Sequence, residues 1–156
     1  MNSVETRQTL TELIYRCNRH YELHEYDQMS LCYTDDAKYR NWRGDVVGRE
    51  AILELMARRS RTRLVRHFIG NVQIGIDGQN EATGLCYVTA YINHQGDPLV
   101  RSVPQIGPPA IAEYHFRFRR VGDQWLIAEK VTVEVFSGMR LELAGDSSAS
   151  VLNINP

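Results

Sequence analysis

His67 is the residue whose type and neighbours in this sequence best suit proton transfer. It lies near the start of an alternating run, 65–76, in which the odd positions include the amides Asn71 and Gln73. An imidazole on the less apolar face of a strand can line a cavity, and its reference pKa of about 6.5 suits acid–base chemistry at neutral pH. A hydrogen-bonded structural histidine is the alternative, and spacing alone slightly favours it. The apolar face of the run consists of Phe68, Val72, Ile74 and Ile76.

Two groups of side chains are candidates to assist such a histidine. Tyr21 and Glu22 come near the end of a predicted helix, and Asp35 and Asp36 follow a second one. A carboxyl group whose pKa is raised by an apolar pocket can act as an acid or a base near neutrality. Each of these side chains can equally be solvated or cap a helix, as Asp36 in particular would do.

Metal and cofactor chemistry find little support in the sequence. His20 and His24 are four residues apart, a spacing at which two imidazoles on a helix can hold one metal ion. No third ligand follows at a recognisable distance, and the dinucleotide, P-loop, nucleophile-elbow and metalloprotease motifs are absent. We therefore predict no metal and no cofactor, and we interpret the two histidines as exposed.

Residues 58–66 form an arginine-rich segment with a strong local excess of positive charge. In a chain of 18 basic and 19 acidic residues with a formal net charge of −1, it contains Arg58, Arg59, Arg61, Arg63 and Arg66. Such a balance gives no overall attraction to nucleic acid or anionic lipid, and it suits an uncharged, apolar substrate. We interpret the segment as a solvated surface with ion pairs, with an anion or nucleic-acid patch as the alternative.

The size and composition predict one globular domain. The chain has 156 residues, of which 43% are hydrophobic and 24% charged. We expect one domain over residues 1–140 and a flexible tail over 141–156. Three cysteines without a CxxC spacing are typical of buried thiols in a reducing compartment. Because neither a signal-like start nor a long apolar run is seen, we expect a cytoplasmic protein with no membrane partner.

These side chains must be positioned by helices in the first half and strands in the second. Apolar residues at spacings of three and four predict two helices within Thr6–Tyr33 that meet near 25–27, the second ending at 34–36. The sequence then predicts a strand at Ala37–Trp42, a turn at 44–48, a helix at Arg49–Ser60, strands at Val65–Ile76 and Ala82–Asn93, a loop at 96–109, and strands at Ala110–Arg120 and Gln124–Phe136. Helices segregated from long antiparallel strands indicate an α+β fold, with the helices covering one face of the sheet.

Six segments, taken in order, carry a resemblance to a known family. The segments EYDQM, YTDDAKY, GREAI, RHFIGNVQIGIDG, EATGLCYVTAY and YHFRFRRVGDQWLI resemble the SnoaL-like group of the nuclear-transport-factor-like superfamily over roughly residues 8–136. Within that group, the HFIG segment beginning at His67 resembles scytalone dehydratase. The resemblance implies a cone, in which a strongly curved antiparallel sheet wraps around three N-terminal helices and encloses a deep apolar pocket.

The same resemblance implies roles for several residues. His67 would be the acid or base, and Tyr21 and Glu22 would match a tyrosine–aspartate pair. Asn41 falls where a substrate-polarising tyrosine is expected, and Ile92 falls where a second histidine is expected. Two further tyrosines are candidates to supply a hydroxyl group in compensation: Tyr114, on the inward face of its strand, and Tyr33.

Two functions of different classes follow from this resemblance. The first is a cofactor-independent lyase or isomerase, dehydratase-like, acting on a small hydrophobic carbonyl compound of the aromatic, polyketide or steroid type. The second is a non-catalytic ligand-binding protein, or the structural small subunit of a ring-hydroxylating dioxygenase, docking through the face formed by Phe68, Val72 and Ile74. The resemblance also implies a homo-oligomer, most simply a dimer.

Overall fold

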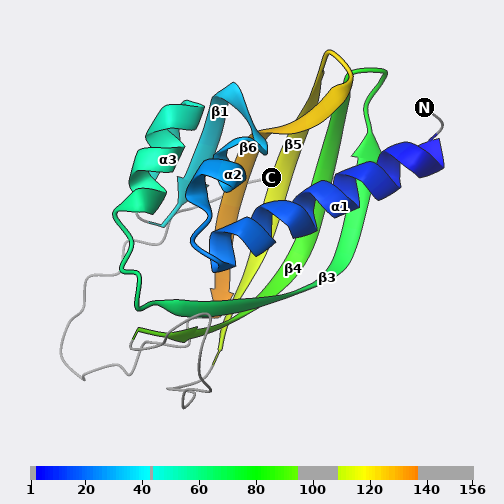
Figure 1. The fold of residues 1–156 in the computed structure, drawn as a ribbon. Coiled ribbons are helices and arrows are strands. Elements are labelled where there is room, and N and C mark those ends of the chain that lie inside the picture. The colour runs from blue at the N-terminus through cyan, green and yellow to red at the C-terminus, as the bar shows by residue number, and fades with distance from the viewer. Residues whose placement is uncertain (1–2, 43, 95–108, 137–156) are drawn as a thin grey trace.

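The computed structural model describes residues 3–42, 44–94 and 109–136 (Figure 1). The elements are α1 (Ser3–Glu22), α2 (Tyr26–Ser30), β1 (Tyr33–Asn41), β2 (Gly44–Val47), α3 (Arg49–Ala57), β3 (Leu64–Ile76), β4 (Glu81–Asn93), β5 (Ala110–Val121) and β6 (Gln124–Phe136). The α+β class and the three N-terminal helices are confirmed. The predicted tail, 141–156, and residues 96–108 of the predicted loop lie outside the described residues, so the domain boundary at 140 stays a prediction.

The six strands form one sheet in the order β2-β1-β6-β5-β4-β3. The strands from β3 to β6 pair antiparallel in sequence order, as their hairpin connections require, and β1 pairs antiparallel with β2. The prediction of a wholly antiparallel sheet was wrong at one pair, because β1 runs parallel to β6. After β1 the chain forms β2 and α3 and then reaches the opposite edge of the sheet, where β3 lies. The strands β4, β5 and β6 follow in order, so that the last strand, β6, lies beside β1. The sheet is curved but not closed, with β2 and β3 at its edges (Figure 1).

Helix α1 lies across the inward face of the sheet, while α2 and α3 lie near β1 (Figure 1). The stripe read from the sequence is the buried face of α1: Leu10, Leu13, Ile14 and Cys17 are at most 4% exposed. Its burial against the sheet stabilises the fold by the transfer of apolar surface out of water. None of the described helices is long and apolar enough to span a membrane.

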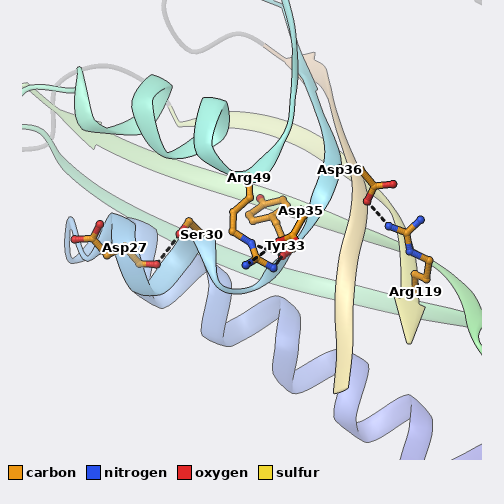
Figure 2. A network of polar contacts seen from close by, with 7 residues as sticks. All are labelled: Asp27, Ser30, Tyr33, Asp35, Asp36, Arg49 and Arg119. Carbon is orange, nitrogen blue, oxygen red and sulfur yellow. Dashed lines mark hydrogen bonds and ion pairs between the residues drawn. The ribbon is translucent and has the colours of Figure 1, made fainter. Parts of the chain in front are cut away.

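The connection from α2 to β1 differs from the prediction. Asp35 and Asp36 belong to β1 and do not end a helix. Both are exposed and pair with arginines: Asp35 lies 2.9 Å from the Nη1 atom of Arg49, and Asp36 contacts Arg119 (Figure 2). Arg49 also donates to the carbonyl oxygen of Tyr33, which fastens the start of α3 to the start of β1. These two aspartates therefore leave the set of acid–base candidates.

Strand β2 was missed by the sequence analysis, which interpreted it as a turn. It has only four residues and begins at a glycine, so its pairing with β1 decides its conformation. Gly48 then turns the chain into α3 with a φ of +99°, a value that side chains other than glycine rarely adopt. Its amide donates to the carbonyl oxygen of Ala37 at 2.8 Å.

A bulge in β3 changes which residues face inward. The register with β4 shifts between Gly70 and Gln73, and Asn71 has a φ of +51°. The prediction of one apolar face through Phe68 and Ile74 was therefore wrong: Phe68 is 67% exposed, whereas Ile74 is 9% exposed. Before the bulge it is the odd positions that face inward, which places His67 on the buried side.

Candidate active site

Glu22 and His67 form a buried hydrogen-bonded pair between the end of α1 and the start of β3. The Oε1 atom of Glu22 accepts from the backbone nitrogen of His67 at 2.6 Å and lies 3.2 Å from the Nδ1 atom of the same residue. The side chains of His67 and Glu22 are 5% and 10% exposed. Two residues predicted from the sequence to work together are thus brought into direct contact.

This geometry sets the protonation states of the pair. Because the carboxylate accepts at Nδ1, the ring holds its proton there and keeps a lone pair on Nε2. Burial lowers the pKa of His67 below its ordinary 6.5, and the charges of Lys130 and Arg59 add to this against the opposing influence of Glu22. Burial alone would raise the pKa of Glu22, but its two hydrogen bonds from His67, together with the charges of His67 and Arg66, outweigh burial and hold that pKa below 4.5. At neutral pH the pair is a carboxylate beside a neutral imidazole, which is the form of a general base.

Two tyrosines flank the imidazole. The ring centroid of His67 lies 5.5 Å from that of Tyr21 and 6.3 Å from that of Tyr114. Burial raises the pKa of both hydroxyl groups, well above the ordinary value in Tyr114, so both stay protonated. Each hydroxyl can therefore donate a hydrogen bond to a substrate oxygen. Both residues were candidates from the sequence.

Lys130, a residue that the sequence analysis missed, also lies on the inward face. It is 7% exposed, and its Nζ atom lies 3.7 Å from the ring centroid of Tyr114. Simple alternation along β6 would place Glu129 inward and Lys130 outward. A register shift relative to β5 leaves Ala128 unpaired and exchanges the two faces, so Lys130 points inward. No pattern in the single sequence marks that bulge.

The arginine-rich segment contributes to the same region. The guanidinium carbon of Arg59 lies 4.1 Å from the ring centroid of Tyr21, and the Nε atom of Arg59 is buried without a hydrogen-bond partner among the described residues. Arg58 and Arg61 are exposed, as predicted, and Arg61 donates to the carbonyl oxygen of His24. The interpretation of the whole segment as a solvated surface is therefore wrong for Arg59.

The remaining predicted residues lie at different distances from the pair. Asn41 is half-buried and hydrogen-bonds to Tyr39, whose ring lies 5.8 Å from the Nζ atom of Lys130. Ile92 is half-buried on β4 and pairs with Val65, two residues before His67. Tyr33 is only 1% exposed, with a side-chain hydrogen bond to Cys17. Asn41 and Ile92 thus adjoin the site, whereas Tyr33 belongs to the hydrophobic core.

The two histidines that are four residues apart, His20 and His24, each contact other residues and do not form a pair. His20 pairs with Glu25 at 2.6 Å, and His24 is 9% exposed, with its Nε2 atom 2.9 Å from the carbonyl oxygen of Arg63. The expectation that both are exposed was wrong, because His20 is half-buried and His24 is buried. Within the described ranges, no three His, Cys, Asp or Glu side chains are grouped so that they could hold a metal ion.

Two hollows in the surface of the described residues lie away from the pair. One of about 550 Å³ is lined by side chains of β3 to β6, among them the exposed Thr83, His115 and Arg117. Another of about 350 Å³ is lined in part by Asp36 and Arg119. Neither of these two hollows is lined by His67 or Glu22.

Comparison with known proteins agrees with this architecture. The family model of the SnoaL-like domain matches residues 2–131. The chain belongs to the SnoaL-like domain family. No curated protein matches the sequence.

Solved structures share the fold of this SnoaL-like domain at low identity. A candidate scytalone dehydratase from Novosphingobium aromaticivorans is 16% identical, with a TM-score of 0.68 over 94% of this chain and 95% of that one. A hexachlorocyclohexane dehydrochlorinase, LinA-type3 from Novosphingobium barchaimii, is 14% identical, with a TM-score of 0.70 over 85% of this chain and 88% of that one. A protein with a cystatin-like fold from Nostoc punctiforme is 16% identical, with a TM-score of 0.67 over 86% and 93% of the two chains. At such identities the likeness shows the fold alone.

Proposed function

We propose that this SnoaL-like protein is a cofactor-independent lyase or isomerase acting on a small hydrophobic carbonyl compound, with His67 as the general base. The observation that carries the proposal is the buried pair, in which Glu22 accepts two hydrogen bonds from His67 and leaves Nε2 of the imidazole free to take a proton. A general base contributes typically 10²–10⁴-fold in rate.

The proposed reaction begins at a carbon next to the substrate carbonyl. The Nε2 atom of His67 takes a proton from that carbon. The electron pair of the broken C–H bond forms a C=C bond to the carbonyl carbon, and the π electron pair of the carbonyl group moves to its oxygen to give an enolate. The hydroxyl groups of Tyr21 and Tyr114 donate hydrogen bonds to this oxygen as its charge develops. In an isomerase the imidazolium returns the proton to another carbon. In a dehydratase it gives the proton to a leaving hydroxyl group, which departs as water.

The aromatic residues around His67 support a flat, apolar substrate of the aromatic, polyketide or steroid type. The rings of Tyr21 and Tyr114 lie beside the imidazole at tilts of 57° and 53°, and Ile92 pairs with Val65 on the strand that carries His67. Two of the structural neighbours, a dehydrochlorinase and a candidate dehydratase, have names that denote the removal of a small molecule from an organic substrate. The dioxygenase-subunit alternative loses one of its two supports, the shared apolar face, because the bulge in β3 separates Phe68 from Ile74. Its other support, the departures from the family pattern at Asn41 and Ile92, stays.

Proton exchange tests the proposal before the natural substrate is known. The protein is incubated in D₂O with an aryl ketone such as α-tetralone and with a 3-ketosteroid, and deuterium at the α-carbon is followed by NMR. We expect exchange faster than in buffer for at least one of the two. Exchange no faster than in buffer containing an equal concentration of serum albumin, for both compounds, would contradict the proposal.

We also infer a cytoplasmic homo-oligomer, most simply a dimer. Three free, buried thiols support a reducing compartment, and the exposed pair of Phe68 and Tyr91, with ring centroids 5.6 Å apart, supplies apolar surface on the outer face. Sedimentation equilibrium should give a mass of two or more times the 17.9 kDa of one chain. A monomer at micromolar concentration would contradict the inference.

A further inference from the structure

Lys130 is a buried cation without a counter-ion in the described part of the chain. Its Nζ atom faces three aromatic rings, with centroids at 3.7 Å for Tyr114, 5.8 Å for Tyr39 and 5.9 Å for Phe116. None of the ion pairs among the described residues includes it, and the neighbouring Glu129 lies nearest Arg40 and Arg117 instead. Ring faces offset only part of the cost of removing an ammonium group from water.

Arg59 places a second cation near His67. Its guanidinium lies over Tyr21, whose ring adjoins the imidazole, and its buried Nε atom has no hydrogen-bond partner among the described residues. Contacts link Arg59 to Tyr21, Tyr21 to His67, His67 to Tyr114 and Tyr114 to Lys130, so both cations adjoin the aromatic rings around the imidazole.

The charges of these groups do not balance. Neither Lys130 nor Arg59 forms an ion pair among the described residues, and the Oε1 atom of the nearby carboxylate, Glu22, accepts both hydrogen bonds from His67. Burial is the main cause that lowers the pKa of Lys130 from its ordinary value. Since the formal charge of the whole chain is −1, this imbalance is a local property that composition does not show. A negatively charged ligand would supply the missing charge.

We propose that the interior of the site binds an aromatic carboxylate, whose charged group lies at Lys130 and whose ring packs against Tyr21 and Tyr114. The inference deepens the proposed function, on which it rests, by naming the class of substrate: a flat carbonyl compound that also carries a carboxylate. Arg59 is half-buried whereas Lys130 is buried, so Arg59 marks the outer end of the site and attracts the anion, while Lys130 holds it at the inner end.

Benzoate and benzamide, which share size and shape but differ in charge, provide the test. Binding of each to the full chain is measured by isothermal titration calorimetry. The chain has two lysines, so Lys130→Met is matched by Lys38→Met, at an exposed position on β1. We expect the wild type and Lys38→Met to bind benzoate at least about ten-fold more tightly than benzamide. In Lys130→Met the two affinities should become equal, with that for benzamide unchanged.

Equal affinities in the wild type, no benzoate binding at millimolar concentration, or an unchanged preference in Lys130→Met would each overturn the proposal. The variant should melt at a higher temperature than the wild type, because it removes a buried charge that lacks a partner. If Lys130→Met does not fold, Lys130→Gln provides the same comparison.

His67→Gln should keep the preference for benzoate. If His67→Gln keeps the preference for benzoate while the wild type shows no proton exchange, the anion site stands and the proposed function fails. If the wild type exchanges protons but does not prefer benzoate, the proposed function stands and the anion site fails.

Discussion

The Oε1 atom of Glu22 lies 2.6 Å from the backbone nitrogen and 3.2 Å from the Nδ1 atom of a single residue, His67. One carboxylate oxygen therefore fixes both the strand that carries the histidine and the tautomer of its ring. The longer side chain of glutamate, found where the family resemblance suggests aspartate, spans from the last residue of α1 to β3. Glu22 acts on the reaction through His67, so it is a positioning residue.

Replacing Glu22 by glutamine should impair the base. The amide can present its NH₂ group to Nδ1, which would move the ring proton to Nε2 and remove the lone pair that takes the substrate proton. We expect the rate of α-proton exchange to fall by roughly 10²-fold or more. An NMR titration of the His67 ring should show a pKa lower than in the wild type, because Glu22 raises it.

Glu54→Gln, at an exposed position on α3, provides the matched control for this substitution. It should leave both the exchange rate and the ring titration at wild-type values. A Glu22→Gln variant that exchanges protons at the wild-type rate, with an unchanged His67 titration, would exclude the positioning role.

The rate should depend on pH through His67. The base acts in its neutral form, and burial holds the pKa of the imidazole below 6.5. The value of kcat/KM should therefore be flat around neutrality and fall as the pH drops through this lowered pKa. A profile whose acidic limb has its midpoint above pH 6.5 would contradict the assignment, and His67→Gln should lack that limb altogether.

Stability should also fall on acidification, in two steps. The folded-state pKa of His67 is lowered from 6.5, so the unfolded chain binds more protons below that pH and the stabilisation is lost as pH falls through the lowered value. The folded-state pKa of Glu22 is likewise lowered, from 4.5, so its stabilisation is lost as the pH falls below 4.5. Urea unfolding at a series of pH values should show a decreasing free energy of unfolding below about pH 6.5, and a smaller decrease there in His67→Gln.

Gly84 should resist substitution because of its close contact with the core. A Cβ atom added there would lie 2.8 Å from the Cε2 atom of Phe118, a side chain that is 2% exposed, and 3.3 Å from the Cδ1 atom of Ile74. Gly84→Ala should lower the free energy of unfolding by roughly 1–3 kcal/mol. Gly70→Ala on the neighbouring strand is the control, since nothing lies within 4 Å of its added Cβ atom. Equal effects of the two substitutions in urea unfolding would show that the contact does not matter.

Much of the fold is predictable from periodicity alone. The stripe at spacings of three and four gives α1, and strict alternation gives β5, whose inward residues Tyr114, Phe116 and Phe118 are all buried as predicted. The residue types near His67 and at the end of the first helix made Glu22 one of several carboxylate candidates, and the family resemblance selected it as the partner of His67. These features depend on local patterns, which a single sequence contains.

The errors have a common cause in pairing between distant strands. The bulge at Asn71 reverses the faces of β3, and the unpaired Ala128 reverses those of β6, which brings Lys130 inward. Short β2 depends on pairing with β1, and the parallel pairing of β1 with β6 depends on the return of the last strand. Each of these is decided by register with a partner, so alternation within one segment does not reveal it.

The most direct test of the account is the rate of α-proton exchange in His67→Gln against that in His115→Gln. Both histidines face carboxylates, but His115 is exposed on β5 and pairs with Glu113, whereas His67 is buried with Glu22. With a ketone that the wild type deuterates, His67→Gln should be slower by roughly 10²–10⁴-fold while remaining folded by circular dichroism. His115→Gln should exchange at the wild-type rate. A folded His67→Gln variant as fast as the wild type would contradict the central claim that this imidazole is the base.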